Sequence, residues 1–532
     1  MDARLEQNLA GRCAVGDIAT RAAARFKERL AVKDGDAELS FHEVNRLACH
    51  LAQALLNRGL GGHAVGIMGR NSWQFIVSYF GCAKAGSVAM LINLGLDPEN
   101  IAYCLRDAEV QWLIADRGLQ PLVEAAVEFL DDAVQIIWFG QESGGKKEFE
   151  ALLQEGGDAE PAVYIDDRAA AQLLYTSGTT SRPKGVLTSH VAVTVTALAS
   201  SLQTQLSAND RVLHILPLYH CADLNAFAVP GFVQGAAAYV MPSFNASAVL
   251  GLIDREQITV AFLLPMMWQA LLGVPDSRER SRPSIRLAMY AMASMPGGRI
   301  AELKQVFPNA LVLLGAGQTE FTPPTTFQKP EHEGIKSGSW GSAVATVEVG
   351  IMDEQGRLLD AGQTGEIVYR GPHAMSGYLN QAEATADAFR HGWFHSGDIG
   401  WMDEEGVVWF SDRKKDMVKS GGENVSSLEV EHCLAQHPAV SAVSVIGLPH
   451  PYWGEAVTAL VIREPGANLG EEALLAYARE RLAGFKVPKR IVFVEEFPKT
   501  GTGKIQKNVL RQWHHELYEA LDAAGSRKEE GK

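Results

Sequence analysis

The chain has 532 residues, 47% of them hydrophobic, and a formal net charge of -15. This length exceeds what one hydrophobic core usually organises, so at least two domains are expected. The acidic balance excludes broad binding to nucleic acid or anionic membranes, because such partners select basic surfaces.

The N-terminus does not have the pattern of a secretory signal, since MDARLEQNLAGR carries charges where a signal peptide needs an apolar core. The apolar stretch at 261–274 is too short and too proline-broken to span a bilayer. The six cysteines are scattered, without the close spacing of a zinc or thiol-redox motif. We therefore expect a cytoplasmic protein with no integral membrane segment.

An amphipathic helix is predicted at 40–59. Ser40 and Glu43 have capping-box spacing, and Val44 begins a series of apolar residues at helical intervals. Beyond it, apolar runs such as AVGIM and VQWLIA alternate with helical stretches, which is typical of helices around buried, mostly parallel sheets. The fold class is therefore predicted to be α/β. The polar, glycine-rich segment 140–150 is predicted to be a surface loop.

A candidate phosphate-binding loop follows the strand-like AQLLY at 171–175. Its sequence, TSGTTSRPKG, places hydroxyls, a flexible backbone and Lys184 at one strand end. Hydroxyls, backbone amides and a lysine can together hold phosphate oxygens. The spacing is not that of the P-loop GxxxxGK[ST], and alone the segment fits an ordinary polar turn equally well.

The segment after residue 411 is predicted to join two domains. The strand-like GVVWF is followed by the charged, glycine-rich SDRKKDMVKSGGENVSS, which we interpret as a linker. Ser426 and Glu429 then offer a second capping box, with alternating strands and a helix near 470–483 beyond. We expect a large N-terminal domain at 1–411, a hinge at 412–416 and a small, mobile α+β domain at 417–532.

Seven segments, taken in order, resemble the adenylate-forming superfamily of acyl-CoA synthetases, peptide-synthetase adenylation domains and luciferases. They cover the chain from its middle almost to its end, and an ordered set of this kind does not arise by chance. They are TSGTTSRPKG (176–185), LPLYHCADLN (216–225), GAGQTEFTPP (315–324), TGEIVYRGP (364–372), GWFHSGDIG (392–400), DRKKDMVKSGGENV (412–425) and PKTGTGKIQK (498–507).

The resemblance implies an ATP site with Mg²⁺. By resemblance Glu320 and Thr176 hold magnesium, and Asp398 and Arg413 hold the ribose; oxygen ligands suit Mg²⁺, and a carboxylate and a guanidinium suit sugar hydroxyls. The other implied ATP-binding residues are Ser177, Gly178, Thr179, Thr180, Lys184, Gly315, Ala316, Gly317, Gln318, Thr319 and Lys504.

The resemblance also implies catalytic roles. Lys504 would be the catalytic lysine, with Lys184 and Glu320 sharing the stabilisation of charge on the phosphoryl oxygens. His220 matches a position that lines the acyl pocket in many relatives, although a lone histidine beside Tyr219 is also compatible with the core. The apolar Phe227, Phe232, Met292 and Met295 could be pocket walls or plain core.

A second half-reaction with a thiol is implied as well. Lys415 occupies the family's hinge position, and Gly421, Gly422 and Glu423 lie on the face that would meet the pantetheine arm of CoA. The small domain would rotate about the hinge, withdrawing Lys504 and presenting this face.

Three positions depart from the family's pattern. Ser181 replaces a usual glycine, Ala316 stands where many relatives have an adenine-stacking aromatic residue, and Trp340 occupies a position that is commonly smaller. The absence of an aromatic ring at 316 should weaken adenine stacking unless another side chain supplies it.

The predicted activity is an acid:CoA ligase that forms an acyl-adenylate and then an acyl-CoA, with AMP and pyrophosphate released. A medium- or long-chain fatty acid is the first expectation for the substrate. An aromatic or alicyclic carboxylate, and CoA-independent adenylation for a carrier protein, are alternatives. The expected partners are the acid, ATP and CoA, with no nucleic acid; whether the chain forms a homodimer stays open.

Overall fold

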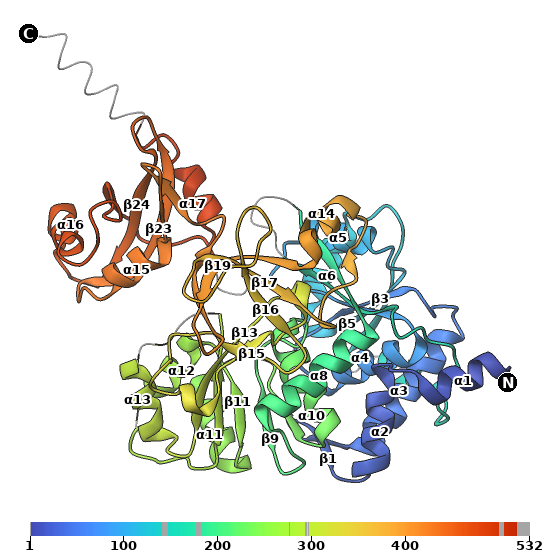
Figure 1. Cartoon of the computed structure of the whole chain (residues 1–532). Helices are drawn as coiled ribbons and strands as arrows, with labels where there is room; N and C mark the ends of the chain where they lie inside the picture. The colour runs from blue at the N-terminus through green and yellow to red at the C-terminus, as the bar shows by residue number, and fades with distance from the viewer. Residues whose placement is uncertain are drawn as a thin grey trace, which may run out of the picture.

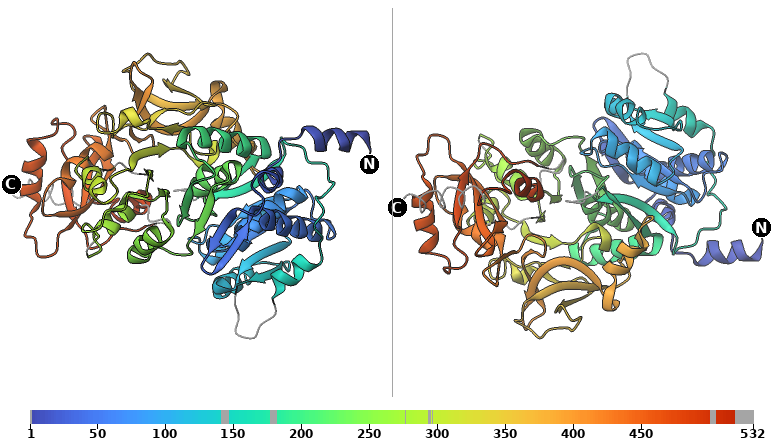
Figure 2. Two further views of the ribbon diagram at one scale, coloured as in Figure 1. Left: turned by 90° about the horizontal axis from the view of Figure 1, so that it is seen from below. Right: turned by 90° about the horizontal axis from the view of Figure 1, so that it is seen from above.

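A computed structural model describes residues 2–140, 147–176, 182–275, 277–292, 295, 297–499 and 505–518. Among these residues the strands form three sheets, of thirteen, seven and five strands. The sheet of five and its helices stand at one end of the molecule, drawn orange to red, and the N-terminal segments in blue lie at the other (Figures 1 and 2).

The seven-stranded sheet is parallel except at the edge that carries the predicted phosphate loop, where β7, β8 and β18 are antiparallel. In spatial order its strands are β18 (Gly377–Tyr378), β8 (Lys184–Ser189), β7 (Ala170–Thr176), β4 (Val88–Leu91), β3 (Ala64–Met68), β5 (Trp112–Asp116) and β6 (Gln135–Phe139).

The thirteen-stranded sheet has a parallel half, from β1 to β13, and an antiparallel half, from β13 to β16. Its strands, in spatial order, are β16 (Glu348–Met352), β17 (Gly365–Arg370), β19 (Phe394–Met402), β20 (Val407–Arg413), β15 (Gly341–Ala343), β14 (Thr326–Phe327), β13 (Leu311–Ala316), β12 (Leu287–Tyr290), β11 (Val260–Phe262), β9 (Arg211–His214), β10 (Ala237–Val240), β1 (Leu30–Asp34) and β2 (Ala37–Ser40).

The C-terminal sheet is mostly antiparallel, and β25 adds to β24 in parallel. Its strands are β21 (Val418–Ser420), β22 (Glu423–Val425), β23 (Val440–His450), β24 (Gly454–Arg463) and β25 (Arg490–Phe493). The helices beside it are α15 (Ser427–Ala435), α16 (Glu471–Arg479) and α17 (Lys507–Trp513). The predicted α/β class, with a larger body of parallel-rich sheets and a smaller C-terminal part, is confirmed.

No helix in the described part of the chain is both long and apolar enough to cross a membrane. The remaining α-helices accompany the two larger sheets. They are α1 (Ala3–Gly11), α2 (Gly16–Phe26), α3 (Phe41–Leu56), α4 (Trp73–Ala85), α5 (Pro98–Asp107), α6 (Gln120–Val127), α7 (Glu148–Gln154), α8 (His190–Thr204), α9 (Cys221–Asp223), α10 (Val229–Gln234), α11 (Ala246–Glu256), α12 (Pro265–Leu272), α13 (Gly297–Val306) and α14 (Ala382–Ala388).

Local sequence signals explain α3 well. The Ser40 hydroxyl accepts the Glu43 amide proton, and the Glu43 carboxylate accepts that of Ser40, which completes the predicted capping box. The apolar face of α3 packs against α4, with Val44 and Leu51 fully buried in the same cluster as Phe80. The predicted helix at 40–59 is therefore confirmed, three residues shorter at its C-terminal end.

Two sequence interpretations need correction. The predicted loop at 140–150 ends early, because α7 begins at Glu148; residues 141–146 lie outside the described part. The predicted linker contains a hairpin, β21–β22, in which Ser420 pairs with Glu423. Gly421 and Gly422, with φ of 61° and 87°, form its two-residue turn, because both central residues of such a turn need positive φ.

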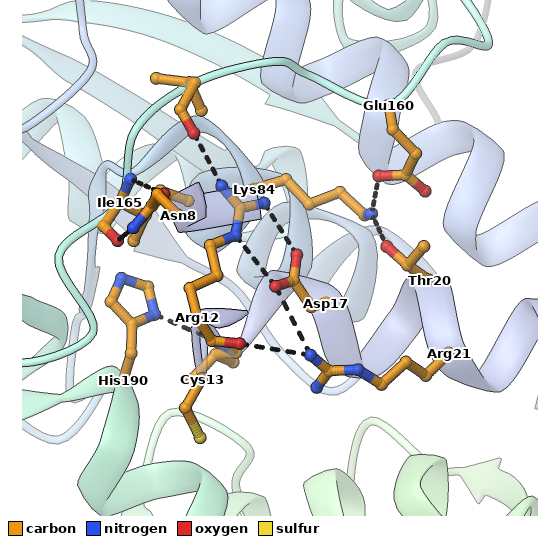
Figure 3. A network of polar contacts seen from close by, with 12 residues as sticks. Asn8, Arg12, Cys13, Asp17, Thr20, Arg21, Lys84, Glu160, Ile165 and His190 are labelled. Atoms are coloured by element: carbon orange, nitrogen blue, oxygen red, sulfur yellow. Dashed lines mark hydrogen bonds and ion pairs between the residues drawn. The ribbon is translucent and has the colours of Figure 1, made fainter. Parts of the chain in front are cut away.

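A polar network ties the N-terminal helices α1 and α2 to α4, to the start of α8 and to the segment before β7 (Figure 3). The Lys84 ammonium, 2% exposed, donates to Glu160 and to the Thr20 hydroxyl, each over 2.6 Å. At the start of α8, the Val15 amide donates to Nδ1 of His190 over 3.2 Å. His190 is therefore held as a neutral hydrogen-bond acceptor.

The buried, neutral His190 predicts that the folded state loses stability in acid. Burial lowers the pKa of His190 to about 4, whereas an unperturbed imidazole has a pKa of 6.5. The unfolded chain therefore binds this proton first as the pH falls, and the stability contributed by the neutral imidazole is lost between those two values. Between pH 7 and 5.5, the wild type should lose about 1 kcal/mol more free energy of unfolding than His190→Asn.

Urea unfolding of both proteins at the two pH values measures this difference. His63→Asn is the matched control, because folding leaves His63 exposed. Equal losses in the wild type and His190→Asn would contradict the prediction.

Candidate active site

The two ends of the predicted phosphate loop lie side by side. β7 ends at Thr176 and β8 begins at Lys184, and these two residues are paired across the antiparallel ladder. The Thr176 hydroxyl donates to the Lys184 carbonyl over 3.5 Å. Lys184 and Thr176 therefore emerge together at one edge of the sheet. The loop residues that lie outside the described part are Ser177, Gly178, Thr179, Thr180 and Ser181.

Tyr378 connects Lys184 with Glu320. It lies on β18, paired with β8, and the Lys184 ammonium is 4.9 Å from the centre of its ring. Its hydroxyl donates to Oε1 of Glu320 over 3.2 Å. Burial, and next the Glu320 carboxylate, raise the pKa of Tyr378, so the phenol stays a proton donor. This residue was not predicted as a site residue, since GYLN carries no chemical signal by itself.

Thr319 and Glu320 form a short 3₁₀ turn, Thr319–Phe321, directly beyond β13. The backbone carbonyl of Glu320 accepts the Met375 amide proton over 2.9 Å, and Phe321 is fully buried against Tyr369. The turn is thus held by its backbone and its aromatic neighbour, which leaves the Glu320 carboxylate to reach Tyr378.

The residues before this turn are closely packed. A Cβ on Gly315 would lie 2.1 Å from Cε of Met289, and one on Gly317 would lie 2.6 Å from Cβ of Pro323. The Ala316 carbonyl accepts from the Thr325 amide and hydroxyl. The Gln318 side-chain nitrogen is buried with no hydrogen-bond partner among the described residues. A buried donor of this kind is costly unless a ligand oxygen accepts from it.

His220 caps α9, and its Nδ1 accepts the Ala222 amide proton over 3.2 Å. Burial lowers the pKa of His220 to about 4, so the ring is neutral at pH 7 and carries its proton on Nε2. Its neighbour Cys221 lies 3.3 Å from the Thr319 hydroxyl, and burial raises the pKa of this thiol to about 12. His220 is therefore suited to donate a hydrogen bond and poorly suited to accept a proton.

Asp398 and Arg413 face each other on β19 and β20. They are paired in the ladder, and Nε of Arg413 lies 2.8 Å from Oδ1 of Asp398, a side chain that is 4% exposed. A hollow of about 350 Å³ adjoins them, lined by Ser396, Gly397, Arg413, Lys414 and Lys415. The structure thus brings the two predicted ribose-binding residues into direct contact at the rim of a hollow.

The predicted CoA face belongs to the C-terminal sheet. The Gly421 amide donates to the Trp453 carbonyl over 2.8 Å, and a Cβ on Gly421 would lie 2.9 Å from the Trp453 ring. Gly422 and Glu423 are exposed. The glycine turn therefore lies against an indole ring, which the sequence prediction did not include in this face.

The predicted hinge, 412–416, covers the last two residues of β20 and the turn that leads toward β21. Asp412 accepts from the amide and hydroxyl of Ser427 at the start of α15, while the Lys415 carbonyl accepts from Arg511 of α17 over 3.3 Å. Lys504 lies outside the described residues, but its flanks are close together, because Lys499 and Ile505 form an antiparallel bridge. A hinge role for Lys415 and a catalytic role for Lys504 stay predictions.

The four apolar residues that could be pocket walls or plain core have different surroundings. Phe232 packs among Phe41 and Phe80 and is core, and Phe227 lies against Phe262 in a second buried cluster. Met295 is buried. Met292 is 62% exposed, with φ of 70°.

The oxygen atoms around Glu320 fit Mg²⁺ carried by a phosphate chain. No three His, Cys, Asp or Glu side chains gather into a metal-binding cluster within the described part of the chain. Mg²⁺ bound with a nucleotide usually takes one or two carboxylates and completes its shell with phosphate and water. Glu320 supplies one such carboxylate.

Comparison with known proteins identifies the family of this chain. Residues 19–379 match the AMP-binding enzyme family, and residues 429–504 match the AMP-binding enzyme C-terminal domain. The chain is 33% identical to the indoleacetate–CoA ligase of Aromatoleum aromaticum over 91% of this chain and 95% of that protein. It is 33% identical to a long-chain-fatty-acid–CoA ligase of Mycobacterium tuberculosis over 90% of this chain and 93% of that protein.

The fold also matches solved structures of this kind of enzyme. ATP-bound MatB from Rhodopseudomonas palustris superposes with a TM-score of 0.86 at 28% identity, covering 94% of this chain and 99% of that one. The chain therefore belongs to the AMP-binding enzyme family, as its motifs predicted, and within it to the acid–CoA ligase class.

Proposed function

We propose that the enzyme uses ATP to convert a carboxylic acid to its acyl-adenylate and then transfers the acyl group to CoA, releasing pyrophosphate and AMP. The observation that carries this proposal is the connected set Lys184, Tyr378 and Glu320 beside the phosphate loop. A cation, a phenol and a carboxylate so arranged suit a magnesium–triphosphate group. The Asp398–Arg413 pair offers a separate place for the ribose.

The residues divide the first half-reaction between them. Thr176 and Lys184 hold phosphate oxygens at the loop, and Asp398 and Arg413 orient the ribose. His220, neutral and protonated on Nε2, donates a hydrogen bond that holds the substrate carboxylate. Lys504 places a second cation near the charge that develops when the carboxylate attacks the α-phosphate.

Mg²⁺, held by Glu320 with Thr176 nearby, would neutralise charge on the phosphates. Tyr378 fixes the direction of the Glu320 carboxylate through its hydrogen bond, and this carboxylate would be a ligand of the metal. Removing a partner that orients a metal ligand commonly lowers metal affinity by about 10–100-fold.

A medium- or long-chain fatty acid is our first proposal for the substrate. Small or aliphatic side chains, Ala222, Leu264 and Ala291, are only partly buried beside the cluster that contains Phe227 and Phe262. Such side chains leave room for an alkyl chain and offer it apolar contact.

An aromatic or alicyclic acid is the alternative, and one observation favours it. Asp223, two residues beyond Cys221, is 1% exposed and pairs with Nδ1 of His214 over 2.9 Å. Its second carboxylate oxygen has no hydrogen-bond partner among the described residues. A buried polar pair so near His220 suits a ring that carries a hydrogen-bonding group better than a plain alkyl chain.

For the second half-reaction we propose that the Gly421–Gly422 turn and Glu423 meet the pantetheine arm after the C-terminal part has rotated about 412–416. Transfer of the acyl group to a carrier protein, without CoA, is the competing proposal. A glycine turn permits close approach of a thin ligand arm to the backbone, which either acceptor would supply.

Release of AMP and pyrophosphate across a panel of fatty, aromatic and alicyclic acids, with and without CoA, tests these proposals. We expect CoA-dependent AMP release with the highest kcat/KM for medium- or long-chain fatty acids. Turnover unaffected by CoA would remove the ligase proposal. A clear preference for ring acids would instead select the alternative substrate class.

A further inference from the structure

Two stacked aromatic pairs involve the β19–β20 ribbon, which carries three of the four rings; the fourth residue, Trp340, directly precedes β15. The rings of Trp340 and Phe410 are 4.4 Å apart and nearly parallel, at 10°. The rings of Trp401 and Trp409 are 5.3 Å apart at 6°. All four side chains are partly exposed, so each pair offers an aromatic surface to a ligand.

The register of the ribbon decides which pair faces the ribose residues. Asp398 pairs with Arg413 and Gly400 pairs with Phe410, because the register shifts between Ile399 and Gly400. Residues two apart in a strand share a face, and paired residues point to the same side. Phe410 therefore lies on the face that carries Asp398 and Arg413, about 7 Å along the strand from them.

The second pair points the other way. Trp401 pairs with Trp409 in the ladder, one residue along from Gly400 and Phe410, and so lies on the opposite face. The indole of Trp409 is also held by a hydrogen bond, since its Nε1 donates to Asp403 over 3.3 Å. This pair is a natural internal control for the first.

The strand ladders and one shared buried cluster relate Trp340 to Ala316. Through the ladders Ala316 pairs with Thr326 and Thr326 with Ala343, so Ala316 is level with the end of β15 and Trp340 lies three residues before that level. Trp340 and Ala316 pack against the same buried cluster, which includes Leu314. A methyl group at 316 offers no ring, whereas Trp340, which borders the same cluster, offers a large one.

We propose that the Trp340–Phe410 pair is the aromatic surface on which the purine base of ATP stacks, in place of a side chain at position 316. The inference rests on the proposed function, because it assumes that Asp398 and Arg413 hold the ribose. The base of a nucleoside held there lies within reach of the same face of the ribbon. The pair would thus determine selectivity for the base while the ribose and phosphate contacts stay independent of it.

Two probes separate the base from the rest of the nucleotide: ATP, and ribose 5-triphosphate, which has no base. Loss of base stacking on an aromatic side chain typically weakens binding about tenfold or more. Trp340→Leu and Phe410→Leu should each raise the Kd for ATP about tenfold and leave the Kd for ribose 5-triphosphate unchanged. Isothermal titration of the full chain measures both constants.

Trp401→Leu is the matched control and should leave both constants unchanged. Adding Ala316→Tyr to Trp340→Leu should restore most of the affinity for ATP, a rescue that a merely structural role of Trp340 would not give. The thermal unfolding midpoint identifies any variant that fails to fold, and Phe410→Leu then provides the independent measurement.

The outcomes are distinct. ATP binding unchanged in Trp340→Leu and Phe410→Leu would overturn the stacking proposal and leave the ligase function standing. An equal loss of affinity for both probes would also overturn it, because the effect would not depend on the base. A wild-type chain that binds neither probe would overturn the proposed nucleotide site itself.

Discussion

Lys504→Ala is expected to slow acyl-adenylate formation by about 10²–10³-fold, because it removes a cation that stabilises the charge developing on the phosphoryl oxygens. Thioester formation from supplied acyl-adenylate should change by less than about threefold, because that half-reaction breaks the bond between the acyl carbon and the AMP oxygen and makes or breaks no bond to phosphorus. ATP–pyrophosphate exchange measures the first step. Single-turnover formation of the acyl-CoA from acyl-adenylate measures the second.

The control for this variant is Lys499→Ala. Lys499 lies at the base of the same segment, where it bridges to Ile505, so its replacement removes a lysine from the segment without removing Lys504. The control should leave both half-reactions near wild-type rates. A Lys504→Ala enzyme that loses both half-reactions equally would contradict the idea that the C-terminal part alternates between two arrangements about residues 412–416.

The sequence predicts well those features that depend on neighbouring residues. Ser40 and Glu43 form their capping box, because both partners lie in one turn of helix. At α15 only half of the predicted capping box is seen: the Ser426 hydroxyl accepts the Glu429 amide proton, while the Glu429 carboxylate pairs with Lys486. Motifs spaced far apart placed Asp398 and Arg413 together only through the family resemblance, and the ladder then shows them paired.

Contacts between distant segments could not be predicted in the same way. Tyr378 reaches Glu320 because β18 pairs with β8, a pairing across almost two hundred residues that no local pattern specifies. The face of Phe410 depends on one shift of register at Gly400, and a shift of one residue reverses which side a side chain faces. The β21–β22 hairpin was missed because the charged, glycine-rich segment was interpreted as a linker, although two adjacent glycines also suit a tight turn.

Glu320→Gln is expected to slow acyl-adenylate formation on the order of 10²-fold and to raise the Mg²⁺ concentration needed for half-maximal rate. The amide keeps the size of the side chain but loses the negative charge, and hard cations such as Mg²⁺ prefer a carboxylate. A metal ion contributes several kcal/mol of stabilisation to phosphoryl chemistry, so a weakened ligand has a large effect. ATP–pyrophosphate exchange across a Mg²⁺ titration measures both changes.

Two further variants show whether the effect comes from the carboxylate at this place. Tyr378→Phe removes only the hydroxyl that donates to Glu320, and it should raise the Mg²⁺ requirement about tenfold with a smaller loss of maximal rate. Glu333→Gln replaces a glutamate that pairs with Lys304 instead, and it should leave the Mg²⁺ titration unchanged. If Glu320→Gln keeps the wild-type Mg²⁺ dependence, the metal is held elsewhere and the hydrogen bond from Tyr378 has no role in metal binding. If the Mg²⁺ concentration needed for half-maximal rate instead rises from wild type to Tyr378→Phe to Glu320→Gln, the metal is bound at the Lys184–Tyr378–Glu320 contact.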